Sequence, residues 1–162
     1  MGIEIERRFL LKEGVPLPDS DSIHHFRQGY LLNSKGLSIR VRVVDQDQAF
    51  ITIKHASSDQ PAVRDEYEYS IPVEDALELL ALSPYHIIRK QRHNIHLDGM
   101  LWEVDFFEEE NEGLILAEVE LPSLDTPVNL PEWIGREISN DPKYLNNNLA
   151  QHPYTTWNTN HE

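Results

Sequence analysis

The sequence predicts a mostly β protein, of the α+β class, that forms a single domain around an antiparallel sheet. Seven or eight short segments alternate apolar with charged residues, as strands with one apolar and one polar face do. Polar turns connect these segments, and Asp98-Gly99 is a strong two-residue hairpin signal. The chain has 162 residues, which suffices for one domain with a sizeable core.

The first part of the chain is predicted to contain five strands. In residues 37–44, for example, apolar residues occupy one parity while Arg40 and Arg42 occupy the other. Gly, Pro and short polar residues mark the loops between the strands. The expected strands are residues 4–11, 28–32, 37–44, 49–55 and 65–71, with loops at 12–23 and 56–63.

The second part of the chain is predicted to mix strands with helices. Pro72 precedes acidic residues that would lie in a first helical turn, which favours a helix over residues 73–82. Pro131 can start another helix, and Asp141-Pro142 supplies an N-cap and a first residue for a helix that ends near Ala150. The expected strands are residues 87–97, 101–107 and 114–121.

The composition restricts the environment and the partners of the protein. Cysteine is absent, which excludes disulfides and thiolate metal sites and is compatible with a reducing compartment. No apolar run is long enough to span a membrane, and the start lacks the pattern of an export signal. The net charge of −14 disfavours nucleic acid and anionic membrane surfaces. We therefore expect a cytoplasmic protein with no membrane and no nucleic-acid partner.

No internal repeat or linker divides the chain, so we expect one domain over residues 1–150. The polar residues 151–162 lack periodicity and are expected to form a fraying C-terminal tail. The sequence has neither a Gly-x-x-x-x-Gly-Lys loop nor a nucleophile-elbow pattern, which argues against P-loop and serine-hydrolase chemistry. The sequence is also compatible with a protein that forms a homodimer.

Charged side chains recur at alternate positions in most expected strands, often as doublets of the same sign. The acidic set is Glu4, Glu6, Glu66, Glu68, Glu103, Asp105, Glu118 and Glu120. The basic set holds 6 of the 14 Lys and Arg residues: Arg8, Arg40, Arg42, Lys54, Lys90 and Arg92. Paired carboxylates suit a hard divalent cation, and paired Arg and Lys suit phosphate oxygens. Periodicity leaves open whether this face is solvated on an open sheet or lines a closed barrel.

Short motifs follow one another along most of the chain. They are residues 4–8 (Glu-Ile-Glu-Arg-Arg), 28–31, 39–42, 52–54, 66–72, 90–92, 102–105, 113–114, 117–121 and 144–146. This series resembles, in order, that of the CYTH superfamily, whose members are also called triphosphate tunnel metalloenzymes, and residues 4–8 are similar to its opening Glu-x-Glu-x-Lys signature. A single Glu-x-Glu would be weak support, but the similar segments span about residues 1–150.

The resemblance implies an eight-stranded antiparallel β-barrel, or tunnel, with a charged lumen and a few covering helices. It also implies an enzyme that uses Mg²⁺ or Mn²⁺ and binds a small-molecule triphosphate. By position, the triphosphate-binding residues would be Arg8, Arg40, Arg42, Lys54, Lys90 and Arg92. The metal-binding residues would be Glu4, Glu6, Glu66, Glu68, Asp105, Glu118 and Glu120. Glu103 shares the parity of Asp105 but is expected nearer the tunnel mouth.

The expected catalytic residues are Arg8, Glu6 and Lys90, and Arg8 departs from the family motif, which has lysine there. Arginine keeps the positive charge but cannot accept a proton. The expected function is hydrolysis of a phosphoanhydride bond in a small triphosphate, most simply inorganic tripolyphosphate. The alternatives are an adenylate cyclase that uses the same site and a non-catalytic binder of polyphosphate or nucleotide. The replacement at Arg8 favours the binder.

Overall fold

The computed structural model describes residues 2–56 and 62–157, so most of the loop expected at 56–63 lies outside the described residues. In the described part, nine strands form one antiparallel sheet. The strands are β1 (Gly2–Leu11), β2 (Ser22–Ser34), β3 (Leu37–Val44), β4 (Gln48–His55), β5 (Val63–Ser70), β6 (Ile88–Leu97), β7 (Met100–Phe107), β8 (Ile115–Glu120) and β9 (Ile134–Glu137). The helices are α1 (Val73–Ala81) and α2 (Asn146–Leu149), with 3₁₀ turns η1 (Glu109–Asn111), η2 (Pro142–Tyr144) and η3 (Tyr154–Thr156).

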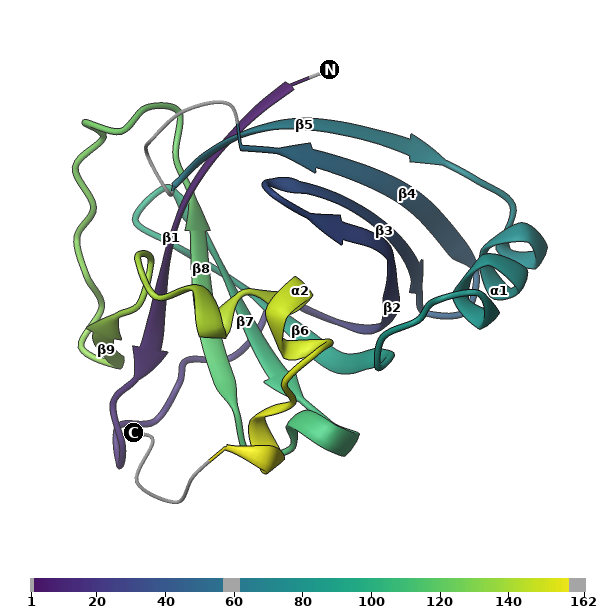
Figure 1. Cartoon of the computed structure of the whole chain (residues 1–162). Coiled ribbons are helices and arrows are strands. Elements are labelled where there is room, and N and C mark those ends of the chain that lie inside the picture. The colour runs from purple at the N-terminus through teal and green to yellow at the C-terminus, as the bar shows by residue number, and fades with distance from the viewer. Residues whose placement is uncertain (1, 57–61, 158–162) are drawn as a thin grey trace.

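The sheet closes on itself through β1 (Figure 1). The strand order is β5-β4-β3-β2-β6-β7-β8-β1, and residues 2–5 of β1 pair with β5 while residues 6–10 pair with β8. Strand β9 pairs with the end of β1 and is the one addition to the ring. The predicted eight-stranded antiparallel barrel is therefore confirmed, with one extra strand.

The apolar parity of the strands faces outward, where helices and the C-terminal segment cover it. On β3, Val41 and Val43 pack with Ala76 and Leu80 of α1, and all four side chains are buried. A second outer core joins β6, β7 and β8 to Tyr144 and to the residues that follow it. This arrangement leaves the charged parity to line the interior, and it requires polar partners inside the barrel.

A third outer core lies where β1, β7 and β8 meet the segment before β9. Trp102 is central, with ring centroids 5.7 Å from Phe9 and 5.6 Å from Trp133. All three rings are buried. Large aromatic rings packed edge to face contribute much of the apolar burial in such a core, so this cluster fixes the half of the barrel that carries β1.

The expected helix after Pro131 is wrong. The chain makes one turn there, in which the amide of Ile134 donates to the carbonyl of Pro131, and then extends into β9. The free end of β1 offers backbone partners to this extended segment. Gly135 permits the close approach, because a Cβ at that position would lie 3.1 Å from the carbonyl oxygen of Leu10. Tertiary pairing thus overrides the local helix signal.

The helix expected over 141–150 is two short pieces instead of one. Asp141 does cap the first piece, since its side chain accepts from the amide of Lys143 and Pro142 follows it. Leu145 then adopts an extended conformation with ψ of 138°, which separates η2 from α2. Leu149 and Ala150 are fully buried after this break, so packing against the barrel accounts for the interruption.

Strand β2 is longer than the expected 28–32, and it begins inside the expected loop 12–23. Its first half pairs with β6 and its second half with β3, so it continues across both neighbours. Of its first five residues only Phe26 is buried, which explains why the apolar alternation was weak there. In the described part of the chain, no helix has the length and hydropathy needed to cross a membrane.

Residues 151–157 pack on the barrel. The rings of Tyr154 and Trp157 have centroids 5.0 Å apart, and Trp157 also lies 5.3 Å from Tyr144. Asn111 accepts a hydrogen bond from the amide of Tyr154. Residues 158–162, the remainder of the expected tail, lie outside the described residues. The domain limit at residue 150 stays a prediction.

Candidate functional site

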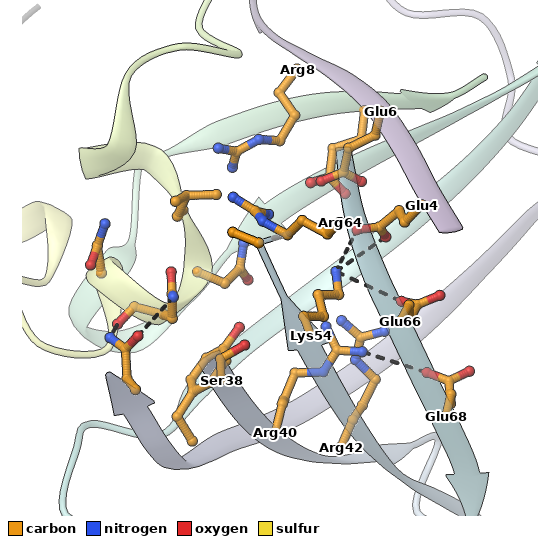
Figure 2. A pocket seen from close by; sticks show the side chains of 18 of the residues that line it. Glu4, Glu6, Arg8, Ser38, Arg40, Arg42, Lys54, Arg64, Glu66 and Glu68 are labelled. Carbon is orange, nitrogen blue, oxygen red and sulfur yellow. Dashed lines mark hydrogen bonds and ion pairs between the residues drawn. The ribbon is translucent and has the colours of Figure 1, made fainter. Parts of the chain in front are cut away.

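The barrel interior contains a cavity of about 570 Å³ lined mainly by charged and amide side chains. Strands from all sides contribute, and α2 lines it from one side (Figure 2). Every residue that the sequence predicted as a site residue lines this cavity except Asp105. The alternation along each strand is the reason: residues of one parity converge once the sheet closes. The open, solvated sheet is therefore excluded.

The shortest ion pairs of the interior surround Asp105. Its carboxylate lies 2.7 Å from Lys90 Nζ and 2.8 Å from Arg92 Nε, and a second Arg92 nitrogen donates at 2.9 Å. Asp105 and Lys90 are each 1% exposed. Burial alone would raise the pKa of Asp105, but Arg92 and Lys90 outweigh burial and hold the pKa well below its usual range. Asp105 thus lies behind the cavity wall, as the counter-ion of two cations that line it.

Arg92 makes two further ion pairs, at 3.2 Å to Glu103 and 3.1 Å to Glu118. These contacts join β6, β7 and β8 across the interior. Arg42 lies on the neighbouring part of the wall, where burial, Arg40 and Arg92 lower its pKa to about 9, so it still carries its charge at neutral pH. Its guanidinium lies 4.2 Å from the centre of the Phe26 ring, which holds it in place.

Arg40 has a buried hydrogen-bond donor without an acceptor among the described residues. One terminal nitrogen donates to Thr52 Oγ1 at 3.1 Å and lies 3.7 Å from Glu68. Its Nε is buried, and among the described residues it has no hydrogen-bond partner. Buried donors of a charged group nearly always have a partner. An anion bound beside Arg40 would supply one.

The acidic side of the cavity is built around Lys54. Figure 2 shows Lys54 between Glu4 and Glu66, and its Nζ lies 3.0 Å and 3.8 Å from their carboxylates. Burial and the charge of Glu4 both raise the pKa of Glu66. The two carboxylates repel each other, which favours a cation between or beside them, and Lys54 occupies that place here.

Glu6 is the most perturbed carboxyl group of the acidic side. Burial, followed by the charges of Glu118 and Glu4, raises its pKa to about 8. It stands directly opposite Glu120 in the pairing of β1 with β8, and the pKa of Glu120 is raised by burial and by Glu4. The strand register therefore holds like charges together at this place, which is unfavourable without a compensating cation.

The donor set suits a divalent cation in its chemistry, because it consists of carboxylate oxygens from β1, β5 and β8. Within the described ranges, no three Asp, Glu or His side chains are already spaced as ligands of one metal ion. Glu4 is instead engaged by Lys54. Binding of a metal would thus require small rearrangements of long Glu side chains, which their rotamer freedom allows.

Several residues that line the cavity are not among those predicted from the sequence. Arg64 shares the parity of Glu66 and Glu68 on β5, so the alternation could have identified it. Glu103 was set apart, yet it lines the cavity whereas Asp105 does not. Asn33 and the asparagines of α2 also line it, and they carry no strand periodicity. The cavity residues outside the predicted set that bear polar side chains are Tyr30, Asn33, Lys35, Ser38, Arg64, Glu103, Asn146, Asn147 and Asn148.

Comparison with known proteins places these observations in a family. The family model described as CYTH domain matches residues 2–154. A protein of Acetivibrio thermocellus named inorganic triphosphatase is 43% identical over 155 residues, which cover 95% of this chain and 97% of that protein. A protein of the same name from Nitrosomonas europaea is 35% identical, with 91% and 96% covered.

A solved structure agrees with both sequence matches. The crystal structure of the inorganic triphosphatase NE1496 superposes with a TM-score of 0.65 at 33% identity, covering 91% of this chain and 97% of that one. The matches span the whole barrel and include each strand that contributes to the cavity. This chain belongs to the CYTH domain family.

Proposed function

We propose that this protein is a metal-dependent hydrolase that cleaves a phosphoanhydride bond of inorganic tripolyphosphate inside the barrel. The enclosed cavity carries the proposal, because it gathers eight cationic side chains and a cluster of carboxylates in about 570 Å³. Such a space suits a short polyanion together with a divalent cation. The two relatives named inorganic triphosphatase support hydrolysis over cyclisation of ATP.

The cations are proposed to bind the phosphate oxygens. Arginine offers paired donors that match phosphate geometry, and Arg40 has a buried Nε still without an acceptor among the described residues. Phosphoryl transfer depends chiefly on positioning and on stabilising charge, so a rigid set of cations supplies much of what catalysis needs. The proposed set is Arg8, Arg40, Arg42, Lys54, Lys90 and Arg92.

Mg²⁺ or Mn²⁺ is proposed to bind on the acidic side of the cavity. The ligands would come from Glu4, Glu6, Glu66, Glu68, Glu118 and Glu120. Asp105 fits this role less well, since its two oxygens already accept from Lys90 and Arg92. A bound divalent cation would neutralise phosphate charge and polarise a phosphoryl oxygen.

Arg8, Glu6 and Lys90 stay the residues proposed nearest the chemistry, with different tasks. Arg8 holds charge beside the phosphates but cannot take a proton. Burial lowers the pKa of Lys90 to about 7 although Asp105 opposes this, and a bound triphosphate would favour the charged form, so Lys90 fits phosphate binding. Burial and neighbouring carboxylates raise the pKa of the Glu6 carboxyl to about 8, so without a cation it is mostly protonated at neutral pH. A divalent cation bound beside it would favour the carboxylate, and we therefore assign Glu6 to holding the cation next to the attacking water, which the cation would acidify.

Phosphate release from tripolyphosphate, measured with Mg²⁺, with Mn²⁺ and with EDTA, tests the proposal. We expect release with a metal and none with EDTA. Glu4→Ala, Glu118→Ala and Arg42→Ala should each abolish it, because they remove a proposed metal ligand or phosphate contact. Detection of cyclic AMP from ATP would favour the cyclase instead, and binding without turnover would favour the binder.

The setting of the activity is also proposed. The absence of cysteine is compatible with a reducing compartment, and we propose that the protein acts in the cytoplasm on a small-molecule substrate. A homodimer stays a prediction, which size-exclusion chromatography with light scattering would test. The net charge of −14 disfavours nucleic acid as a partner, because the cations are gathered inside the barrel.

A further inference from the structure

A neutral side chain from outside the barrel strands contacts one cation of the cavity wall and reaches a second through Gln28. Asn146, the first residue of α2, accepts two hydrogen bonds at its Oδ1. One comes from Lys90 Nζ at 2.8 Å and the other from Gln28 Nε2 at 3.0 Å. Since an ammonium can only donate, the oxygen of the Asn146 amide must be the atom that faces Lys90.

Gln28 extends this contact to a second cation. Its Oε1 accepts from Arg42 Nε at 2.7 Å, and its side chain is fully buried. One short path of hydrogen bonds therefore runs from Lys90 through Asn146 and Gln28 to Arg42. Buried amides in such a path have few alternative orientations, so each one restricts its neighbour.

The same stretch of chain also holds Arg8. The carbonyl oxygen of Tyr144 accepts from a terminal nitrogen of Arg8 at 2.9 Å. Tyr144 itself is 1% exposed, in the outer core shared with Leu149 and Ala150. Packing outside the barrel thus fixes a segment, residues 144–146, whose polar atoms point inward at cations.

The neutrality of these acceptors matters for the charge of the cavity. Lys54 and Arg40 have carboxylates within ion-pair distance, which offset their charge. Arg8 and Arg42 have none within that distance among the described residues, and their acceptors are a carbonyl and an amide. A neutral acceptor orients a cation without cancelling its charge. This part of the wall keeps an uncompensated positive charge available to an anion.

We propose that Asn146 and Gln28 are positioning residues, which hold Lys90 and Arg42 in the geometry that binds the triphosphate. The proposal rests on the proposed function, because it deepens the assignment of these two cations to phosphate. It makes the C-terminal segment part of the substrate-binding apparatus, although the strands supply the charges. Asn146 acts through the cations and does not take part in the reaction itself.

Two substitutions at one position separate positioning from stability. Asn146→Ala removes the acceptor, and we expect the dissociation constant for tripolyphosphate to rise about tenfold, as loss of a hydrogen bond to a charged group does. Asn146→Asp keeps an acceptor oxygen at the same place but adds a second negative charge beside Lys90, which Asp105 already pairs. Its binding should weaken at least as much, while the melting temperature of the unliganded variant should not fall below that of the unaltered protein.

Isothermal titration calorimetry with sodium tripolyphosphate in EDTA measures binding in the absence of turnover. Asn111→Ala serves as the control, because Asn111 is buried, holds the amide of Tyr154 in the C-terminal segment and does not line the cavity. We expect this control to lower the melting temperature and to leave the dissociation constant unchanged.

The outcomes distinguish a failure of the positioning role from a failure of the proposed function. If the unaltered protein binds tripolyphosphate and both Asn146 variants bind it equally well, the positioning role is wrong and the proposed function stands. If Asn111→Ala weakens binding as much as Asn146→Ala, general loosening explains the effect and the positioning role is again wrong. If the unaltered protein neither binds tripolyphosphate in EDTA nor releases phosphate from it with Mg²⁺ or Mn²⁺, the proposed function fails and the inference fails with it. If it releases phosphate with a metal but does not bind in EDTA, the KM of the Asn146 variants with that metal decides the positioning role in the same way.

Discussion

Replacing Asp105 with asparagine tests whether this residue is a counter-ion or a metal ligand. Asp105→Asn keeps the size of the side chain and removes its negative charge. Lys90 and Arg92 would then lose the carboxylate that lies 2.7 Å and 2.8 Å from them. Lys90 is 1% exposed and burial already lowers its pKa to about 7, so without Asp105 it would either stay buried as a charge beside the neutral Asn146 or lose its proton.

The structure gives the size of the expected effect. Removing one partner of a buried ion pair costs about 3–5 kcal/mol, because the other charge is left buried and uncompensated. For a chain of 162 residues, each kcal/mol lowers the melting temperature by about 2–4 °C. We therefore expect Asp105→Asn to melt about 10 °C below the unaltered protein. Asp105→Asn combined with Lys90→Met should recover part of this loss, since it removes the stranded charge.

Thermal unfolding in EDTA at pH 7 is the appropriate assay, because EDTA removes any contribution from bound metal. Glu120→Gln is the matched control. Burial, followed by the charge of Glu4, raises the pKa of Glu120, so neutralising Glu120 relieves both effects and should leave the melting temperature unchanged or higher. A melting temperature of Asp105→Asn within about 2 °C of the unaltered protein would refute the reasoning, because a buried counter-ion cannot be lost at so small a cost.

Three further predictions concern single positions. Burial and neighbouring carboxylates raise the pKa of Glu6 from 4.5 to about 8, so the folded state holds this proton longer than the unfolded chain. The contribution of the protonated Glu6 carboxyl to the free energy of unfolding is fully present below pH 4.5 and is lost as pH rises through about 8. Urea unfolding in EDTA should show this loss, and Glu6→Gln should remove it; equal pH profiles for both would contradict the assignment. Gly29→Ala should lower the free energy of unfolding by about 1–3 kcal/mol, because the new Cβ would lie 2.8 Å from Ile87 Cδ1. Gly2→Ala, which meets no atom within 4 Å, is its control, and equal unfolding midpoints would refute the clash. Arg8→Ala should lower kcat/KM for tripolyphosphate by about 10- to 100-fold through loss of a charged contact, whereas Arg8→Lys should retain most of it. Comparable losses in the two Arg8 variants would show that charge alone is not what the position supplies.

Much of the barrel could be predicted, because apolar and charged residues alternate regularly along its strands. Residues 37–44 are the clearest case, where the predicted strand and β3 coincide. The extra strand β9 could not be predicted, because residues 134–137 pair only once the edge of β1 is in place. The same holds for the break at Leu145, which depends on packing against the barrel and not on local sequence.

The candidate site could likewise be predicted only in part. Alternation identified the charges that strands direct inward, and it could have identified Arg64 by the same rule. Spacing alone could not show that Asp105 pairs with two cations behind the wall, because parity gives the face of a residue and not its depth. Asn146 belongs to a short helix that lies 56 residues beyond Lys90 in the chain, so only the folded structure brings the two together.

The central claim is that the charged interior binds a triphosphate and, with a divalent cation, hydrolyses it. The most direct measurement is phosphate released from tripolyphosphate and from ATP by the purified protein, with Mg²⁺, with Mn²⁺ or with EDTA. We predict release from tripolyphosphate with at least one of the two metals and none with EDTA. If neither tripolyphosphate nor ATP releases phosphate with Mg²⁺ or with Mn²⁺, the claim is contradicted.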